Sequence, residues 1–132
     1  MEVGVPQQLQ ELIYEELISE AIYRELASIA PNEEHQRLLL ELAAENRGLA
    51  IDFSRILYDL VGYSYNPELR LMALEGNYED NLRKCLLRES ESFRNYDRNH
   101  FSANSYALKS AYYKARTDHN VHTTRLLYLL NK

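Results

Sequence analysis

The chain has 132 residues, of which 45% are apolar and 27% are charged. This balance is typical of a soluble globular protein and excludes a disordered one. The 20 acidic residues outnumber the 15 basic ones, so the formal net charge is −5, and no basic block is present that would hold nucleic acid or an anionic membrane. No apolar run approaches the ~20 residues that span a bilayer. From the charge and the absence of such a run, we expect neither a nucleic-acid nor a membrane partner.

The cysteine content and the first residues of the sequence indicate a compartment. Cys85 is the only cysteine, so an internal disulfide is excluded. The first residues show neither the basic stretch nor the apolar stretch of a secretory signal. Together these features predict a cytoplasmic protein.

Apolar residues recur at helical spacing along almost the whole chain, and only 4 Gly and 3 Pro interrupt them. The pattern predicts four helices, over residues 6–30, 33–61, 77–99 and 103–130. Asn32 is expected to cap the second helix at its start, and Gly62 is expected to stop it.

The segment between the second and third helices, residues 62–76, is predicted to be a crossover. Within it, residues 67–75 are expected to form a short helix. Ser102 or Asn104 is expected to cap the fourth helix.

Four helices of this length predict an all-α protein, with one four-helix bundle over residues 1–132. The first two helices are joined by a few residues, as are the last two, so each pair is expected to form an antiparallel hairpin. The crossover is long enough, when extended, to span the length of the bundle.

Five polar residues stand in the helical stripes where Leu is expected. They are Glu16, Glu45, Glu89, His119 and His122. A buried carboxylate is costly unless it is paired or binds a metal. All five fall near the middle of their helices, so an antiparallel bundle brings them to a common depth, where we expect them to surround a cation.

The two halves of the chain repeat this pattern. Glu16 is followed seven residues later by Tyr23, and Glu89 is followed seven residues later by Tyr96. A tyrosine at this spacing lies two turns along the same helix face, close enough to bond a carboxylate or a metal-bound water.

The second helix of each half carries a matching pair of positions. Glu45 lies 29 residues after Glu16, and His119 lies 30 residues after Glu89. Three residues beyond these positions stand Gly48 and His122, a spacing that directs both side chains of a pair to one site.

Across residues 9–130 this pattern resembles rubrerythrin-type proteins of the ferritin-like superfamily, the di-iron carboxylate four-helix bundles. These proteins carry Glu and Tyr on helices one and three and Glu-x-x-His on helices two and four. The chain is also similar to small ferritin-like proteins of spore-forming Gram-positive bacteria. The resemblance implies two antiparallel hairpins joined by a long crossover, with oxidoreductase chemistry that links iron to oxygen or peroxide. An external electron donor is implied, because one cysteine cannot build a rubredoxin-like domain.

Two of the six family ligands differ in this chain. Gly48 stands at the helix-two His position and His119 at the helix-four Glu position. By resemblance, the first metal site therefore keeps Glu16 and Glu45 but has no nitrogen ligand.

The second metal site would hold Glu89, His119 and His122, with Glu45 as a shared carboxylate. Two imidazoles and a carboxylate suit Fe(II), Mn(II) or Zn(II), so we expect one strong site for iron, manganese or zinc. Further hydrogen-bond partners of the ligands are expected at Tyr23, Tyr96 and Asp118.

An alternative to metal binding stays open. In it, the core holds no metal, protonated His119 and His122 pair with the three glutamates, and the chain is a non-catalytic structural or interaction module.

Gly48 also has more than one interpretation. It opens a pocket, it makes room for a repositioned Asp52 or His119, or it reflects drift after the metal was lost.

The remaining polar residues carry weaker expectations. Glu20 is expected to reach solvent from the helix flank, and Asp118 either replaces the lost glutamate or remains an outer or surface acid. Cys85 is expected to be a small buried residue, and His35 and His100 are expected at the surface. Both functional hypotheses allow a homodimer through helix faces.

Overall fold

The computed structural model describes residues 4–131 and, for residues 100–102, the backbone alone. It contains four helices, α1 (Val5–Ser28), α2 (Glu33–Val61), α3 (Tyr78–Ser102) and α4 (Tyr106–Leu130). No strand occurs within the described range, so the prediction of an all-α four-helix bundle is confirmed. Among the same residues, no helix combines the length and the apolar composition that crossing a bilayer requires.

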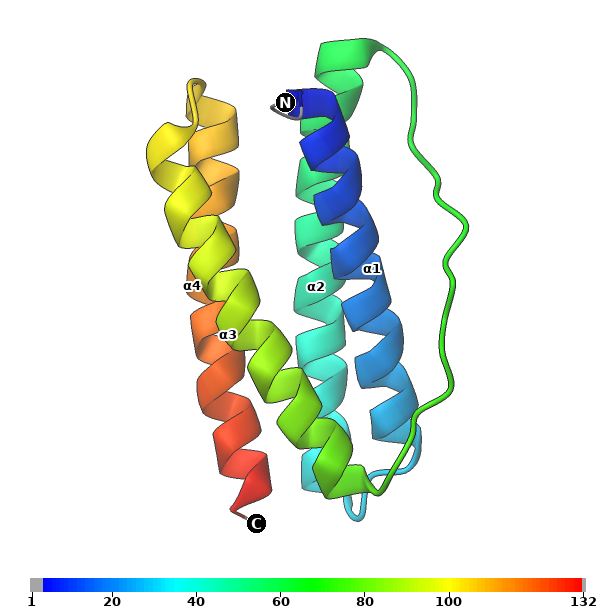
Figure 1. Cartoon of the computed structure of the whole chain (residues 1–132). Coiled ribbons are helices and arrows are strands. Elements are labelled where there is room, and N and C mark those ends of the chain that lie inside the picture. The colour runs from blue at the N-terminus through cyan, green and yellow to red at the C-terminus, as the bar shows by residue number, and fades with distance from the viewer. Residues whose placement is uncertain (1–3, 132) are drawn as a thin grey trace.

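The direction of the helices follows from the length of their connections. Figure 1 shows α1 running from the N-terminus to the far end of the bundle, where a short turn leads into α2, which returns. The crossover, residues 62–77, then brings the chain back along the outside of α1, so that α3 starts at the end where α2 started. α4 returns beside α3 after a second short turn.

The crossover has no helix within it, so the prediction of a short helix over residues 67–75 is wrong. The reason is reach, because this segment must span the bundle from the end of α2 to the start of α3. An extended residue advances about 3.3 Å and a helical one 1.5 Å, so a helix over nine of these residues would shorten the connection considerably.

The helix ends are fixed by local side-chain and backbone contacts. The Asn32 side chain accepts from the backbone N–H of His35 at 3.0 Å, and Gly62 stops α2 in the left-handed conformation with φ of 77°, both as predicted. The cap of α4 is Ser105, which accepts from the N–H of Leu108 at 3.1 Å. The prediction of Ser102 or Asn104 is wrong, because α3 continues to Ser102 and the turn after it is correspondingly later.

Two apolar clusters fill the bundle, one toward each end. The first is centred on Phe53 and Tyr112, and the second on Leu26 and Leu126. Between them lies a group of buried polar side chains from all four helices, which we call the polar layer: Glu16, Asn46, Glu89, His119 and His122.

The buried face of α2 is rotated relative to the predicted one. Leu38, Glu45 and Leu60 lie in one helical stripe, in which Glu45 was predicted to face the core, but all three are only partly buried or exposed, and Leu60 is 56% exposed. The buried face instead includes Leu39 and Asn46. Both patterns have helical spacing and share Leu42, Leu49 and Phe53, so periodicity alone could not separate them.

Two glycines of α2 give a paired stability prediction. Gly62→Ala places a side chain in the left-handed region and is expected to lower the free energy of unfolding by about 1 kcal/mol. Gly48→Ala is expected to raise it by about 1 kcal/mol, because Gly48 is inside the helix and an added Cβ meets nothing within 4 Å. Urea unfolding followed by far-UV circular dichroism measures both changes, and equal effects of the same sign would contradict this account.

Candidate metal centre

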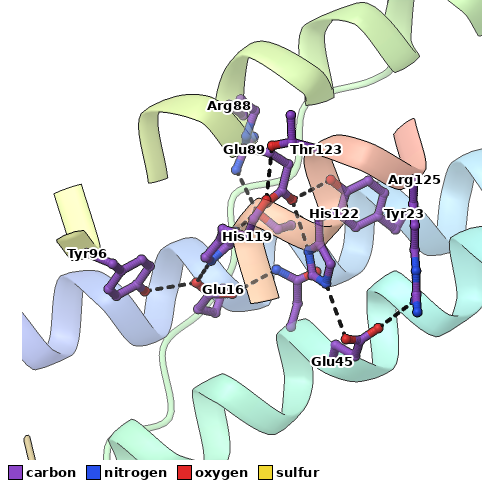
Figure 2. A network of polar contacts seen from close by, with 12 residues as sticks. Glu16, Tyr23, Glu45, Arg88, Glu89, Tyr96, His119, His122, Thr123 and Arg125 are labelled. Carbon is purple, nitrogen blue, oxygen red and sulfur yellow. Dashed lines mark hydrogen bonds and ion pairs between the residues drawn. The ribbon is translucent and has the colours of Figure 1, made fainter. Parts of the chain in front are cut away.

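Each tyrosine of the sequence repeat bonds the glutamate of the other half. The Tyr23 hydroxyl, on α1, donates to Glu89 Oε1 on α3 at 2.5 Å, and the Tyr96 hydroxyl, on α3, donates to Glu16 Oε1 on α1 at 2.9 Å. Figure 2 shows these contacts at the two sides of the polar layer. The repeat therefore produces a crossed pair of contacts between α1 and α3, and both carboxylates are buried.

His119 lies between the two buried carboxylates. Its Nδ1 faces Glu89 Oε2 in a short hydrogen bond, and its Nε2 is 2.6 Å from Glu16 Oε1 (Figure 2). The ring also stacks on Tyr96, with ring centroids 5.2 Å apart and planes 11° apart. A ring that donates from both nitrogens is an imidazolium, so without a metal His119 is itself the cation of the layer.

The pKa values of these groups follow from their contacts. Burial disfavours a charged imidazole, but the carboxylates of Glu16 and Glu89 outweigh burial and raise the pKa of His119 to about 10. Burial also opposes ionisation of Glu89, yet the short bond from His119 and the attraction of the His122 ring at 3.4 Å lower the pKa of that carboxyl to about 2. The layer therefore holds ionised groups at neutral pH.

His122 is fully buried, and neither of its ring nitrogens has a hydrogen-bond partner among the described residues. Its Nδ1 is 3.4 Å from Glu89 Oε1, and its Nε2 is 3.6 Å from Glu45 Oε2. Attraction to these carboxylates raises the pKa of His122 despite its burial. Buried polar atoms without a bond are rare and require an explanation, such as a ligand that the ring is placed to hold.

Three of the predicted ligands converge. Glu89, His119 and His122 each offer one ligand atom, and these three atoms lie within 4.8 Å of one another. They come from α3 and α4, and α1 contributes Glu16 behind His119. The donor set expected for the second metal site is therefore assembled in one place.

Glu45 lies at the edge of this group. Its side chain is 34% exposed, and Arg125 donates to its Oε1 at 3.0 Å. The contacts with His122 and Arg125 lower its pKa despite partial burial. The expectation of a carboxylate in the core is wrong for Glu45, because the rotation of α2 places it on the flank of the helix.

Asn46 takes the core position that was assigned to Glu45, and sequence reasoning missed it. It is fully buried, and its Nδ2 donates to Glu16 Oε2 at 2.7 Å. Its Oδ1 has no hydrogen-bond partner among the described residues. The available signal was that Asn46 stands in phase with Leu39, Leu42 and Leu49, the stripe that the structure selects.

Asp118 is half-buried, and none of the hydrogen bonds within the polar layer involves it. Burial and the nearby charge of Glu45 raise its pKa. It thus lies beside the layer on α4 and bonds none of the three convergent ligands. The substitution for the lost glutamate is not observed.

Two expectations about surface residues are wrong. Glu20 does not reach freely into solvent but is largely buried, with its carboxylate covered by Arg24 at 3.0 Å and Arg47 at 3.5 Å. His35 is buried, and its Nδ1 is 2.9 Å from the Tyr78 hydroxyl, because the start of α2 packs against the start of α3. The side chain of His100 lies outside the described part of the chain.

The structure also shows the surroundings of Cys85 and Gly48. Cys85 is buried as predicted, and burial raises the pKa of its thiol to about 12, which makes it unreactive at neutral pH. The space beside Gly48 is not filled by a displaced neighbour, because Asp52 pairs with Lys114 at 3.0 Å and His119 lies between its two carboxylates.

Cavities between α1 and α3 lead toward the layer. Glu16 and Tyr96 line one of about 190 Å³, and Glu89 lines a small void of about 10 Å³. Arg88 lines both and donates to Ser19 Oγ at 3.1 Å, which links α3 to α1 between them. The larger cavity therefore reaches Glu16 from this side of the bundle.

Comparison with protein-family models, curated proteins and solved structures finds no match to this chain.

The opposite pKa shifts of His119 and Glu89 predict how stability depends on pH. His119 is raised from 6.5, so its contribution is complete below pH 6.5 and is lost as the pH rises through about 10. Glu89 is lowered from 4.5, so its contribution is complete above pH 4.5 and is lost as the pH falls through about 2. Urea unfolding of chelator-treated protein should find the highest stability between pH 4.5 and 6.5.

The His119→Gln variant separates this interaction from the rest. It leaves two buried carboxylates without their cation, so we expect a loss of about 3–5 kcal/mol near pH 6. The loss of stability above pH 6.5 should become smaller, and the loss that remains should come from deprotonation of His122. A variant with the full alkaline fall of the parent protein would contradict the assignment of His119 as the charged group.

Proposed function

We propose that this chain is a ferritin-like metal-binding bundle that holds one divalent cation in its polar layer. The observation that carries the proposal is His122, which is fully buried with two unbonded ring nitrogens, next to the carboxylate of Glu89 and the ring of His119. A bound cation would give one His122 nitrogen a closer partner than the carboxylates of Glu89 and Glu45, which lie 3.4 and 3.6 Å from the ring.

The ligands proposed are Glu89, His119 and His122. A carboxylate and two imidazoles suit Fe(II), Mn(II) or Zn(II). If Nδ1 of His119 is a ligand, its Nε2–H still donates to Glu16 Oε1, the contact that fixes the tautomer and the ring orientation of many metal-bound histidines. Tyr23 would hold Glu89 in the same way, through the bond that its hydroxyl already donates.

The first metal site of the family would be weak or absent. The Glu16 carboxylate already accepts hydrogen bonds from Tyr96, Asn46 and His119. Glu45 is paired with Arg125, and Gly48 offers no nitrogen. Two carboxylates that are already satisfied, with no imidazole, form a poor set for a second cation.

The proposed chemistry follows the resemblance. Bound iron would supply oxygen- or peroxide-linked oxidation, which in this chain needs an external electron donor. The residues of the chain would orient the ligands through Tyr23 and Glu16, and the cavity between α1 and α3 would admit small solutes. A cytoplasmic location and a homodimer belong to the same proposal.

A second candidate function is a metal-free structural or interaction module. It is favoured by His119, whose two ring nitrogens face Glu16 and Glu89 and already neutralise charge in the layer. The two candidates differ in the protonation state of His119. The ring keeps both protons in the metal-free module, whereas metal binding requires it to give up one.

Metal analysis tests the proposal. We expect protein purified without chelator to contain about one Fe, Mn or Zn per chain, and added metal to raise the melting temperature of chelator-treated protein. Both effects should disappear in His122→Ala and persist in His35→Ala, which alters a buried histidine outside the polar layer. Protein that binds none of the three metals between pH 6 and 9 would favour the metal-free module.

Restoring the family ligands tests the ferritin-like assignment. In Gly48→His/His119→Glu we expect a second metal per chain, since the space beside Gly48 is open and the glutamate can bridge two cations. Gly48→Ala/His119→Glu is the matched control, because it lacks the new imidazole. Equal metal content in the two double variants would show that position 48 does not correspond to the family's histidine.

A further inference from the structure

A separate cavity of about 350 Å³ lies between α1, α3 and the crossover. Residues 70–75 of the crossover form one wall, and Figure 1 shows this segment passing outside α1 before it joins α3. The apolar part of the lining includes Ile18, Ala21, Ile22, Leu71 and Leu74. The volume falls at the lower end of the range of small-molecule sites, about 300–1,000 Å³.

The crossover is hydrogen-bonded to the helices at each end of the cavity wall, and, within the described range, the residues between these two points make no such bond. The backbone N–H of Arg70 donates to the Tyr14 hydroxyl at 3.2 Å, and the carbonyl of Glu75 accepts from Asn81 Nδ2 at 3.0 Å. Residues 71–74 make no hydrogen bond within the described part of the chain, and Leu71 and Met72 are 57% and 84% exposed. Adjacent exposed apolar side chains beside a cavity indicate a surface that binds something apolar.

The charge of the lining is opposite to that of the protein. Three cationic residues, Arg70, Lys84 and Arg88, face two acidic ones, Glu25 and Glu75, in a chain whose formal net charge is −5. Among the described residues, neither Arg70 nor Lys84 forms an ion pair with a carboxylate. Lys84 Nζ donates to the Glu75 carbonyl at 3.4 Å, but both cationic residues are exposed and neither is neutralised by a described carboxylate, so both can attract an anion.

We propose that this cavity binds an unbranched aliphatic monocarboxylate, with its carboxylate at Arg70 and Lys84 and its chain against the apolar wall. The apolar lining suits an aliphatic body, and the two exposed cations suit an anionic head. A cavity of this size accommodates one chain, which excludes a two-chain phospholipid as its occupant. The proposal does not depend on a metal in the polar layer.

The floor of the cavity connects it to the polar layer. Ile22, Cys85 and Arg88 line both this cavity and the small void beside Tyr23 and Glu89. A molecule in the cavity would therefore be separated from Glu89 by one layer of side chains.

Titration of decanoate into the full-length, chelator-treated protein tests the binding, with isothermal calorimetry as the readout and concentrations below micelle formation. We expect saturable binding of one decanoate per chain and no comparable binding of decylammonium or decanol. Equal binding of all three would show non-specific adsorption. Binding to anionic phospholipid vesicles without binding of free decanoate would assign the surface to membranes. Either result would overturn the proposal.

Variants locate the site. Lys84→Gln should weaken decanoate binding by about tenfold, the loss expected for one charge-assisted hydrogen bond. Arg83→Gln is the matched control, because Arg83 is a neighbouring cation on α3 that does not line the cavity. Ala21→Phe should fill the cavity and abolish binding while the far-UV spectrum stays unchanged. Unaltered affinity in both Lys84→Gln and Ala21→Phe would overturn the site. Because these titrations use chelator-treated protein, that result would leave the metal proposal untouched.

Discussion

The carboxylates of Glu16 and Glu89 lie on either side of the His119 ring, and this contact joins α1, α3 and α4 in the middle of the core. Two buried negative charges without a cation would be strongly unfavourable. Three neighbouring side chains support this contact, since Tyr23 and Tyr96 donate to the two carboxylates and Asn46 donates to Glu16. The apolar clusters on both sides bury the layer, and a hydrogen bond is stronger in such surroundings than in water.

The same contact determines how the layer responds to a metal. A proton on His119 and a cation held by Glu89, His119 and His122 compete for one ring nitrogen, so the affinity for metal should increase with pH. His122 makes no short hydrogen bond to a described residue, although Glu89 and Glu45 raise its pKa, so a cation would also displace a proton from this ring. In the proposed site, the differences from the ferritin-like pattern would leave one proton-sensitive cation site in place of a symmetric pair.

Much of the fold was predictable from sequence, because four amphipathic helices and their caps are local features. The Glu–Tyr repeat predicted which residues of α1 and α3 meet, although not that each tyrosine bonds the glutamate of the opposite helix. Glu45 and Asn46 were misassigned, since a rotation of α2 by a fraction of a turn leaves the spacing unchanged. The burial of His35 depends on the packing of α2 against α3, which no local pattern encodes.

The crossed bonds from Tyr23 to Glu89 and from Tyr96 to Glu16 have a consequence for assembly of the fold. Apolar side chains tolerate sliding, so two hairpins held by leucines alone could settle at several heights. Here, a displacement by one turn would strand both glutamates opposite hydrocarbon and separate them from His119. The buried polar contacts therefore favour one vertical alignment of the two hairpins over the others.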